Sequence, residues 1–194
     1  MNHTNYLQNF IAMSLKGSRT TADYLPWNEM LLLIQKLLRN KEYNFATLIA
    51  VGCYTGLRIS DLKCLRWEEM KTPLVICEQK TRKERTIHLN NDLLLFLEQV
   101  KNDIQPQDQE LIFNLSMQYT NRKLKKIAKQ YKLNIRFSTH TFRKTFGRRI
   151  WVKNDYSEKS LILLSQVFNH SSIVITKRYL GIRDKEIADI YINL

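Results

Sequence analysis

Apolar residues recur at helical spacing along most of the chain. A stripe of apolar side chains three or four positions apart follows Pro26, a residue that suits the first turn of a helix. This stripe consists of Met30, Leu33, Ile34, Leu37 and Leu38. Gly56 is expected to end a second helix over 43–55, and Ser60 to cap a third. Similar patterns predict helices over 92–101, 119–131, 140–152, 158–168 and 172–179, and a last amphipathic piece over 184–192.

The middle of the chain has a different pattern. Residues 74–79 and 85–89 read as two strands, and the charged segment 80–84 separates them. This arrangement is typical of a β-hairpin. The sequence therefore predicts a mainly α fold with one small antiparallel β-sheet, an α+β architecture.

The composition favours a helix-rich domain over a disordered or sandwich-like chain. The 194 residues fit one domain, 44% of them are hydrophobic, and there are only 5 glycines and 3 prolines. Residues 1–24 show little periodicity, and 16–21 reads as a linker. We therefore expect the folded domain to comprise residues 25–194.

The charge favours a polyanionic partner. Lys and Arg outnumber Asp and Glu by 31 to 18, which gives a formal net charge of +13. Nucleic acid is the first candidate and an anionic membrane surface the second, with a merely basic protein as the plain alternative. The apolar stretches are too short to span a bilayer, and the N-terminus lacks the layout of a signal peptide. We expect an intracellular protein with no membrane partner.

The cysteines are Cys53, Cys64 and Cys77, an odd number without a Cys-x-x-Cys pair. Each has an apolar or aromatic residue beside it. This pattern predicts small core residues in a reducing compartment rather than a disulfide framework or a zinc site.

His140 and Arg143 are the first residues that suggest chemistry. They lie three residues apart, on one face of the expected helix, where an imidazole and a guanidinium suit a phosphate or a carboxylate. Arg58 follows Gly56 at the start of a helix, where anions bind. For each of the three, a solvated surface side chain is the plain alternative.

Three further residues have chemical potential and an equally ordinary explanation. Lys80 lies at the hairpin tip, where its cation reaches into a groove or into solvent. His170 is consistent with a residue that bonds the backbone at a helix start. Tyr179 is one of 9 tyrosines, and most tyrosines are packing residues.

In order, five segments resemble the tyrosine recombinase (phage integrase) family. They are Thr55–Leu62, Lys80, His140–Arg143, Asn169–Ser172 and Tyr179. The family has an arginine in a T-G-x-R-x-x-E-L segment, a lysine in a β-hairpin and an H-x-x-R pair. A histidine or tryptophan in a G-H-x-S-like segment follows, with the nucleophilic tyrosine nine residues later. The resemblance covers about residues 25–190 and implies the catalytic-domain fold of these DNA breaking-rejoining enzymes.

Two residues depart from the family pattern. Asp61 stands where the family has Glu, which still allows a buried acidic supporting residue of shorter reach. Asn169 stands where the family has Gly, and Asn accepts left-handed geometry better than most residues. The interval from His170 to Tyr179 would place the two on roughly opposite faces of one continuous helix. They converge only if the chain bends at Ser171–Ile173.

The resemblance implies DNA cleavage and rejoining through a covalent 3′-phosphotyrosine. Its catalytic set would be Arg58, Lys80, His140, Arg143, His170 and Tyr179. The arginines would hold the charge of the reacting phosphate, and the histidines would supply hydrogen bonds, with His140 as a proton acceptor for the tyrosine. Lys80 would protonate the leaving 5′-oxygen, although Arg82, Lys83 and Arg85 lie in the same hairpin.

Neither a metal ion nor another cofactor is expected, and no small-molecule substrate. Two-metal nucleases need clustered carboxylates, and no such cluster accompanies His140 or His170 in the sequence. We therefore expect activity in the presence of a chelator.

Double-stranded DNA is the implied partner. Residues 1–24 would be a linker or the remnant of an upstream core-binding domain, and 25–194 the catalytic domain. The tail helix 184–192 would pack on its own domain or dock onto a neighbouring protomer, as in a tetramer on DNA. A solvated helix face is the alternative for most of the cations expected to contact the DNA backbone, which are Arg122, Lys123, Lys125, Lys126, Lys129 and Arg148.

The function implied is site-specific recombination in the integration or excision of a mobile element, or in inversion. The protein would be bacterial or phage-encoded, cytoplasmic and associated with the nucleoid. Two alternatives stay open: relaxation of DNA by a type IB topoisomerase-like enzyme, and a catalytically silent DNA-binding accessory protein.

Overall fold

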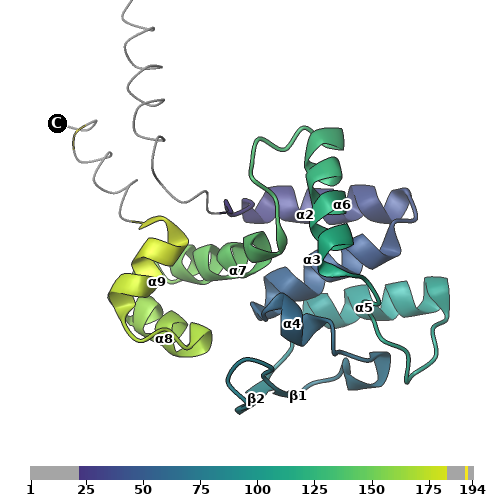
Figure 1. Ribbon diagram of the computed structural model, residues 1–194, viewed down its shortest axis with the longest axis horizontal. Helices are drawn as coiled ribbons and strands as arrows, with labels where there is room; N and C mark the ends of the chain where they lie inside the picture. Colours follow the sequence, from purple (N-terminus) through teal and green to yellow (C-terminus); the bar gives the residue numbers. More distant parts are fainter. Residues whose placement is uncertain (1–21, 183–190, 192–194) are drawn as a thin grey trace, which may run out of the picture.

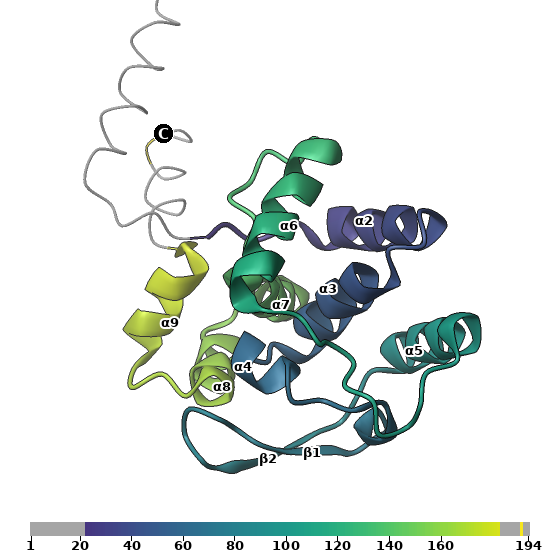
Figure 2. The same ribbon diagram turned by 45° about the vertical axis from the view of Figure 1, so that its right-hand side comes forward.

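The computed structural model describes residues 22–182 and Tyr191. The predicted tail helix 184–192 therefore lies outside the described residues, apart from Tyr191, and so does most of the expected linker 1–24. Figures 1 and 2 show a helical fold with a hairpin at its lower edge. The helices are α2 (Trp27–Arg39), α3 (Tyr43–Thr55), α4 (Ile59–Leu62), α5 (Asn91–Ile104), α6 (Met117–Gln130), α7 (Thr139–Lys153), α8 (Glu158–Phe168) and α9 (Ile173–Leu180), with a 3-10 turn, η1 (Trp67–Glu69).

The small antiparallel sheet is confirmed. Strand β1 (Leu74–Cys77) pairs with β2 (Glu84–Ile87), and Leu74 lies opposite Ile87. Along β1 buried and exposed residues alternate, as expected for a hairpin that covers the domain with one face. The predicted α+β class is therefore correct, with shorter strands than expected.

Most helix ends agree with the sequence, because capping residues mark them. Helix α3 ends at Gly56, which adopts the left-handed conformation (φ 64°). Serines cap α6, α7, α8 and α9 by accepting a hydrogen bond from the first turn. The expected cap by Ser60 is wrong: Ser60 lies inside α4, and Arg58 occupies the cap position without a side-chain cap bond. The single turn α4 begins at Ile59, one residue before Ser60, so Ser60 cannot cap it. The Ser60 hydroxyl instead donates a hydrogen bond to Asp61 Oδ1 (3.3 Å).

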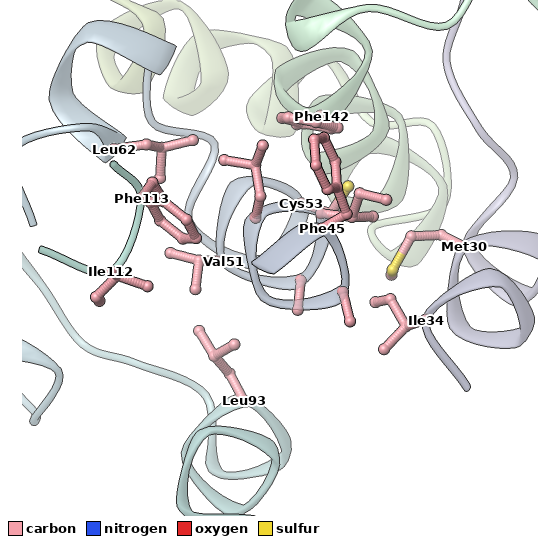
Figure 3. Packing of buried hydrophobic residues seen from close by; sticks show 14 of the residues in the cluster. Met30, Ile34, Phe45, Val51, Cys53, Leu62, Leu93, Ile112, Phe113 and Phe142 are labelled. Atoms are coloured by element: carbon pink, nitrogen blue, oxygen red, sulfur yellow. The ribbon is translucent and has the colours of Figure 1, made fainter. Parts of the chain in front are cut away.

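The buried apolar residues form two clusters. The large cluster joins α2–α6, the hairpin and the start of α7; Figure 3 shows Ile34, Val51, Leu93 and Phe142 packed around α3. The small cluster belongs to α7–α9 and consists of Trp151, Leu161, Leu164, Phe168, Leu180 and Ile182. Helix α7 contacts α3 on one side and both α8 and α9 on the other, and it therefore connects the clusters (Figure 1).

The prediction that all three cysteines are core residues is wrong for two of them. Cys53 is buried in α3, but Cys64 and Cys77 are exposed. Cys64 follows the single-turn α4, and its thiol reaches Ser60 O (3.4 Å). Cys77 occupies an outward position of the alternating strand β1. In the described part of the chain, no helix is long and apolar enough to cross a membrane.

Candidate active site

All six predicted catalytic residues line one cleft of about 370 Å³. The cleft lies where the end of α3, the hairpin, the start of α7 and the end of α8 meet. Residues far apart in the sequence therefore converge, as the ordered motifs predict. A larger hollow of about 520 Å³ beside α6 is lined by none of the six.

Arg143 lies at the centre of this meeting point and is buried. Its guanidinium donates one hydrogen bond to Gly56 O (2.6 Å) at the end of α3 and another to Phe168 O (2.9 Å) at the end of α8. It also lies 4.3 Å from the centre of the Phe168 ring. Burial and the neighbouring charge of Arg58 lower the pKa of Arg143 to about 10, so it stays charged at neutral pH.

Arg58 also binds the carbonyl of Phe168. Its Nη2 donates to Phe168 O (3.2 Å), and its Nη1 forms an ion pair with Glu78 Oε2 (2.9 Å). The carbonyl groups at the end of a helix carry the negative end of its dipole. The last turn of α8 is therefore a main-chain acceptor for both arginines.

His170 and Tyr179 lie side by side, with ring centres 5.3 Å apart. The bend expected at Ser171–Ile173 explains this: Ser172 is extended (φ −158°, ψ 158°), and α9 begins only at Ile173. Just before His170, Asn169 adopts the left-handed conformation (φ 51°). Both geometric expectations are confirmed.

The Tyr179 hydroxyl oxygen is buried and has no hydrogen-bond partner among the described residues. Burial raises the pKa of Tyr179 to about 12, although Arg143 and Arg58 oppose this shift. Its ring packs against Phe168 (5.5 Å between ring centres) and lies 5.4 Å from Lys144 Nζ. The phenol is therefore neutral at neutral pH, and its oxygen makes no hydrogen bond to the described residues.

The second histidine of the set is held by its neighbour in α9. Nδ1 of His170 lies 3.0 Å from Thr176 Oγ1, and the residue lines the cleft. Burial, together with the charges of Arg143, Arg58 and Lys80, lowers the pKa of His170. A neutral imidazole at neutral pH follows.

Lys80 and His140 also line the cleft, and both are exposed. Of the other hairpin cations, Arg85 is engaged in an ion pair with Glu78 (3.2 Å) and donates to Val167 O (3.1 Å). Arg82 and Lys83 are exposed and do not line the cleft. This geometry favours Lys80 as the hairpin cation that reaches the site.

Asp61 is buried, as the sequence allows for a supporting acid. Its Oδ1 accepts a hydrogen bond from Gln79 N (2.9 Å), which fixes the hairpin next to α4. The carboxylate that pairs with Arg58, however, is Glu78. Sequence reasoning missed Glu78 and Lys144, and it named Arg85 only as an alternative to Lys80. The signal available for Glu78 and Lys144 was only their closeness to Lys80 and Arg143.

The cations predicted to contact DNA lie outside the cleft. On α6, Lys123 pairs with Glu42, Arg122 lies over the Tyr119 ring, and the remaining lysines of the run are exposed. Asn121 of α6 accepts a hydrogen bond from Thr139 N (3.3 Å) and so connects this helix to the start of α7. Arg148 is half-buried, with its guanidinium 4.7 Å from the Tyr24 ring centre.

Comparison with solved structures identifies the fold. A recombinase structure, XerA, matches with a TM-score of 0.63 at 17% identity over 91% of this chain and 66% of that one. XerH site-specific recombinase bound to its difH substrate matches with a TM-score of 0.60 at 19% identity over 87% of this chain and 53% of that one. The fold is that of site-specific recombinase catalytic domains. The chain nevertheless spans less than two thirds of these two recombinases.

Sequence comparison adds the family. The phage integrase family model matches residues 24–186. The "probable integrase/recombinase YoeC" of Bacillus subtilis (strain 168) is 30% identical over 162 residues, which cover 77% of this chain and 83% of that protein. The chain belongs to the phage integrase family.

Proposed function

We propose that this protein is a site-specific DNA recombinase that cleaves and rejoins DNA strands through a 3′-phosphotyrosine on Tyr179. The observation that carries the proposal is the convergence of two guanidinium groups, two imidazoles, an amine and a tyrosine on one cleft. These groups match the needs of phosphoryl transfer, in which negative charge builds on the non-bridging oxygens.

The step is a transesterification. The Tyr179 oxygen attacks the phosphorus and forms the new ester bond, while the bond from phosphorus to the 5′-oxygen breaks. His140 takes the phenol proton, and Lys80 gives a proton to the leaving 5′-oxygen. Because the phosphotyrosine keeps the energy of the broken ester, a 5′-hydroxyl of another strand completes the exchange by the reverse step.

The arginines supply the electrostatic part. A guanidinium has more N–H donors than the two that Arg58 and Arg143 each use for protein acceptors, so both retain donors for a phosphate. A phosphate in the cleft would also give the buried Tyr179 hydroxyl its missing polar neighbour. Substrate binding and activation of the nucleophile would then occur together.

Double-stranded DNA is the proposed substrate and partner. XerH, which shares the fold, has been solved on its difH substrate. The net charge of +13 suits such a polyanion. We further propose self-association into a tetramer on DNA through residues 184–192, with residues 25–194 as the catalytic domain, residues 1–24 as a linker or remnant of a core-binding domain, and a cytoplasmic location at the nucleoid.

The test is formation of a protein–DNA adduct that resists denaturant. Wild-type protein and Tyr179→Phe are incubated in EDTA with nicked DNA that carries candidate sites from the genomic neighbourhood. We expect an adduct with the wild type and none with Tyr179→Phe. Tyr156→Phe is the matched control, because Tyr156 is exposed and does not line the cleft.

Two results would contradict the proposal. An adduct that survives in Tyr179→Phe would place the nucleophile elsewhere. Measurable DNA binding without any adduct, even after fusion of a core-binding domain, would identify a binding module instead.

A further inference from the structure

We propose that Glu78 is a positioning residue for Arg58, a role that rests on the proposed function. Glu78 follows the last residue of β1 and is 5% exposed. Its carboxylate holds the Arg58 guanidinium in the orientation that leaves its remaining donors for the reacting phosphate. No motif of the sequence singled out this residue.

Both carboxylate oxygens of Glu78 accept hydrogen bonds. Oε2 accepts from Arg58 Nη1 (2.9 Å) and from Thr81 Oγ1 (2.8 Å), while Oε1 accepts from Arg85 Nη1 (3.2 Å). The main chain of Glu78 is fixed as well, because its N–H donates to Lys83 O and its C=O accepts from Arg82 N. The acceptor is therefore rigid on both sides, as a positioning group must be.

The two arginines that share Glu78 also share the end of α8. Arg58 donates to Phe168 O and Arg85 to Val167 O. The carboxylate thus closes a loop of bonds that runs from the hairpin to α8, and Arg58 is held at both of its terminal nitrogens. Rotation of the Arg58 guanidinium would break one of these bonds.

Electrostatics gives the reason for an acid here. Arg58, Arg85 and Arg143 converge on neighbouring carbonyl groups, and their like charges repel one another. Among the described residues, Glu78 is the carboxylate that forms ion pairs within this group. Burial alone would raise the pKa of Glu78, but hydrogen bonds from Thr81, Arg58 and Arg85 lower it. The group is an anion at neutral pH and offsets part of the repulsion.

A positioning role differs from a role in DNA affinity. Removal of the negative charge leaves the cleft more positive, so binding of DNA should stay equal or become tighter. The chemical step should slow, because Arg58 no longer meets the transition state in one fixed geometry. The two quantities therefore change independently, whereas a loss of folding would lower both.

The experiment uses the whole chain and the nicked DNA described above. Glu78→Gln keeps the size of the side chain and removes its charge. Glu84→Gln is the matched control, an exposed glutamate of the same hairpin. We measure the first-order rate of adduct formation at saturating DNA, the dissociation constant for the DNA, and the thermal unfolding midpoint. Glu78→Gln should slow the adduct rate by roughly tenfold or more, with equal or tighter binding, and Glu84→Gln should leave the rate unchanged.

The outcomes separate this inference from the proposed function. A wild type that forms no adduct overturns both. If the wild type forms the adduct and Glu78→Gln forms it at a rate within about twofold of the wild type, the positioning role alone is overturned. A slower rate accompanied by weaker DNA binding also overturns it. If Glu78→Gln does not fold, Thr81→Val decides, because it removes one hydrogen bond to the same Oε2. A rate loss of roughly twofold to fivefold supports the role, and no loss overturns it.

Discussion

Arg143 joins the two apolar clusters, because it binds the end of one helix from each of them. On the side of the large cluster, α3 ends at Gly56, whose carbonyl accepts from Arg143. On the side of the small cluster, α8 ends at Asn169, and the carbonyl of Phe168 accepts the second bond. Of the residues that line the cleft, Arg58 and Lys80 come from the elements around the large cluster, and His170 and Tyr179 from those around the small cluster. The site thus depends on how firmly the two halves are held together.

Removal of the bridge itself should have the largest effect. In Arg143→Ala both carbonyls lose their donor, and we expect the free energy of unfolding to fall by about 3 kcal/mol. The rate of adduct formation should fall by roughly a hundredfold or more, because a phosphate ligand is lost as well. Urea denaturation and the adduct assay measure the two. Arg149→Ala is the control on the same helix, and an equal loss there would contradict the bridging role.

The two helix ends should respond oppositely to a change of the left-handed residue. At Gly56 a Cβ would lie 2.6 Å from Phe146 Cδ1, and φ is 64°. We expect Gly56→Ala to lower the free energy of unfolding by about 2 kcal/mol. Asn169→Gly should raise it by about 0.5 kcal/mol, because glycine adopts this conformation without cost. Urea denaturation of both variants decides, and a loss in Asn169→Gly would mean that the Asn side chain has its own role.

A smaller effect is expected inside the small cluster. A Cβ on Gly147 would lie 2.6 Å from Leu180 Cδ2 and 3.0 Å from the Phe168 ring. Because Leu180 Cδ2 is the end of a flexible side chain that can shift, Gly147→Ala should lower the free energy of unfolding by only about 1 kcal/mol. It displaces α9, however, so the adduct rate should fall more than stability predicts. An unchanged rate in the destabilised variant would show that Tyr179 moves independently of this contact.

The smallest effect should be a pH dependence of stability. The pKa of His170 is lowered in the folded protein, so protonation favours the unfolded chain. The stability that the neutral ring contributes is present above the ordinary pKa of 6.5 and is lost as pH falls through the lower folded value. His170→Gln should therefore lose less stability than wild type between about pH 7.5 and pH 5.5. Equal losses in the two proteins, measured by urea denaturation, would exclude this origin.

The sequence predicts most of the fold because its signals are local. Gly56 and the serine caps mark helix ends. The bend before α9 is expected only because the family resemblance requires His170 and Tyr179 to converge. The exposed Cys64 and Cys77 show the limit, because apolar neighbours in sequence do not decide which side of a short element faces the core.

The predicted catalytic residues meet in one cleft, but their partners could not be predicted. Glu78 precedes Lys80 by two positions, and nothing in its sequence context indicates that it reaches Arg58 of another element. The acceptors on α8 are invisible for a different reason. Main-chain carbonyls are the same in every residue, so only the three-dimensional arrangement shows which of them are used.

The Phe168 carbonyl has a genetic consequence. A point mutation replaces a side chain but leaves the main-chain oxygen in place, so the acceptor that Arg58 and Arg143 share is inherited with the helix rather than with a codon. Substitution of residue 168 changes the ring beneath the guanidinium and spares the oxygen. Only an insertion, a deletion or a shift of the helix end would therefore remove this acceptor during evolution. Substitutions of the side chain at this position leave it in place.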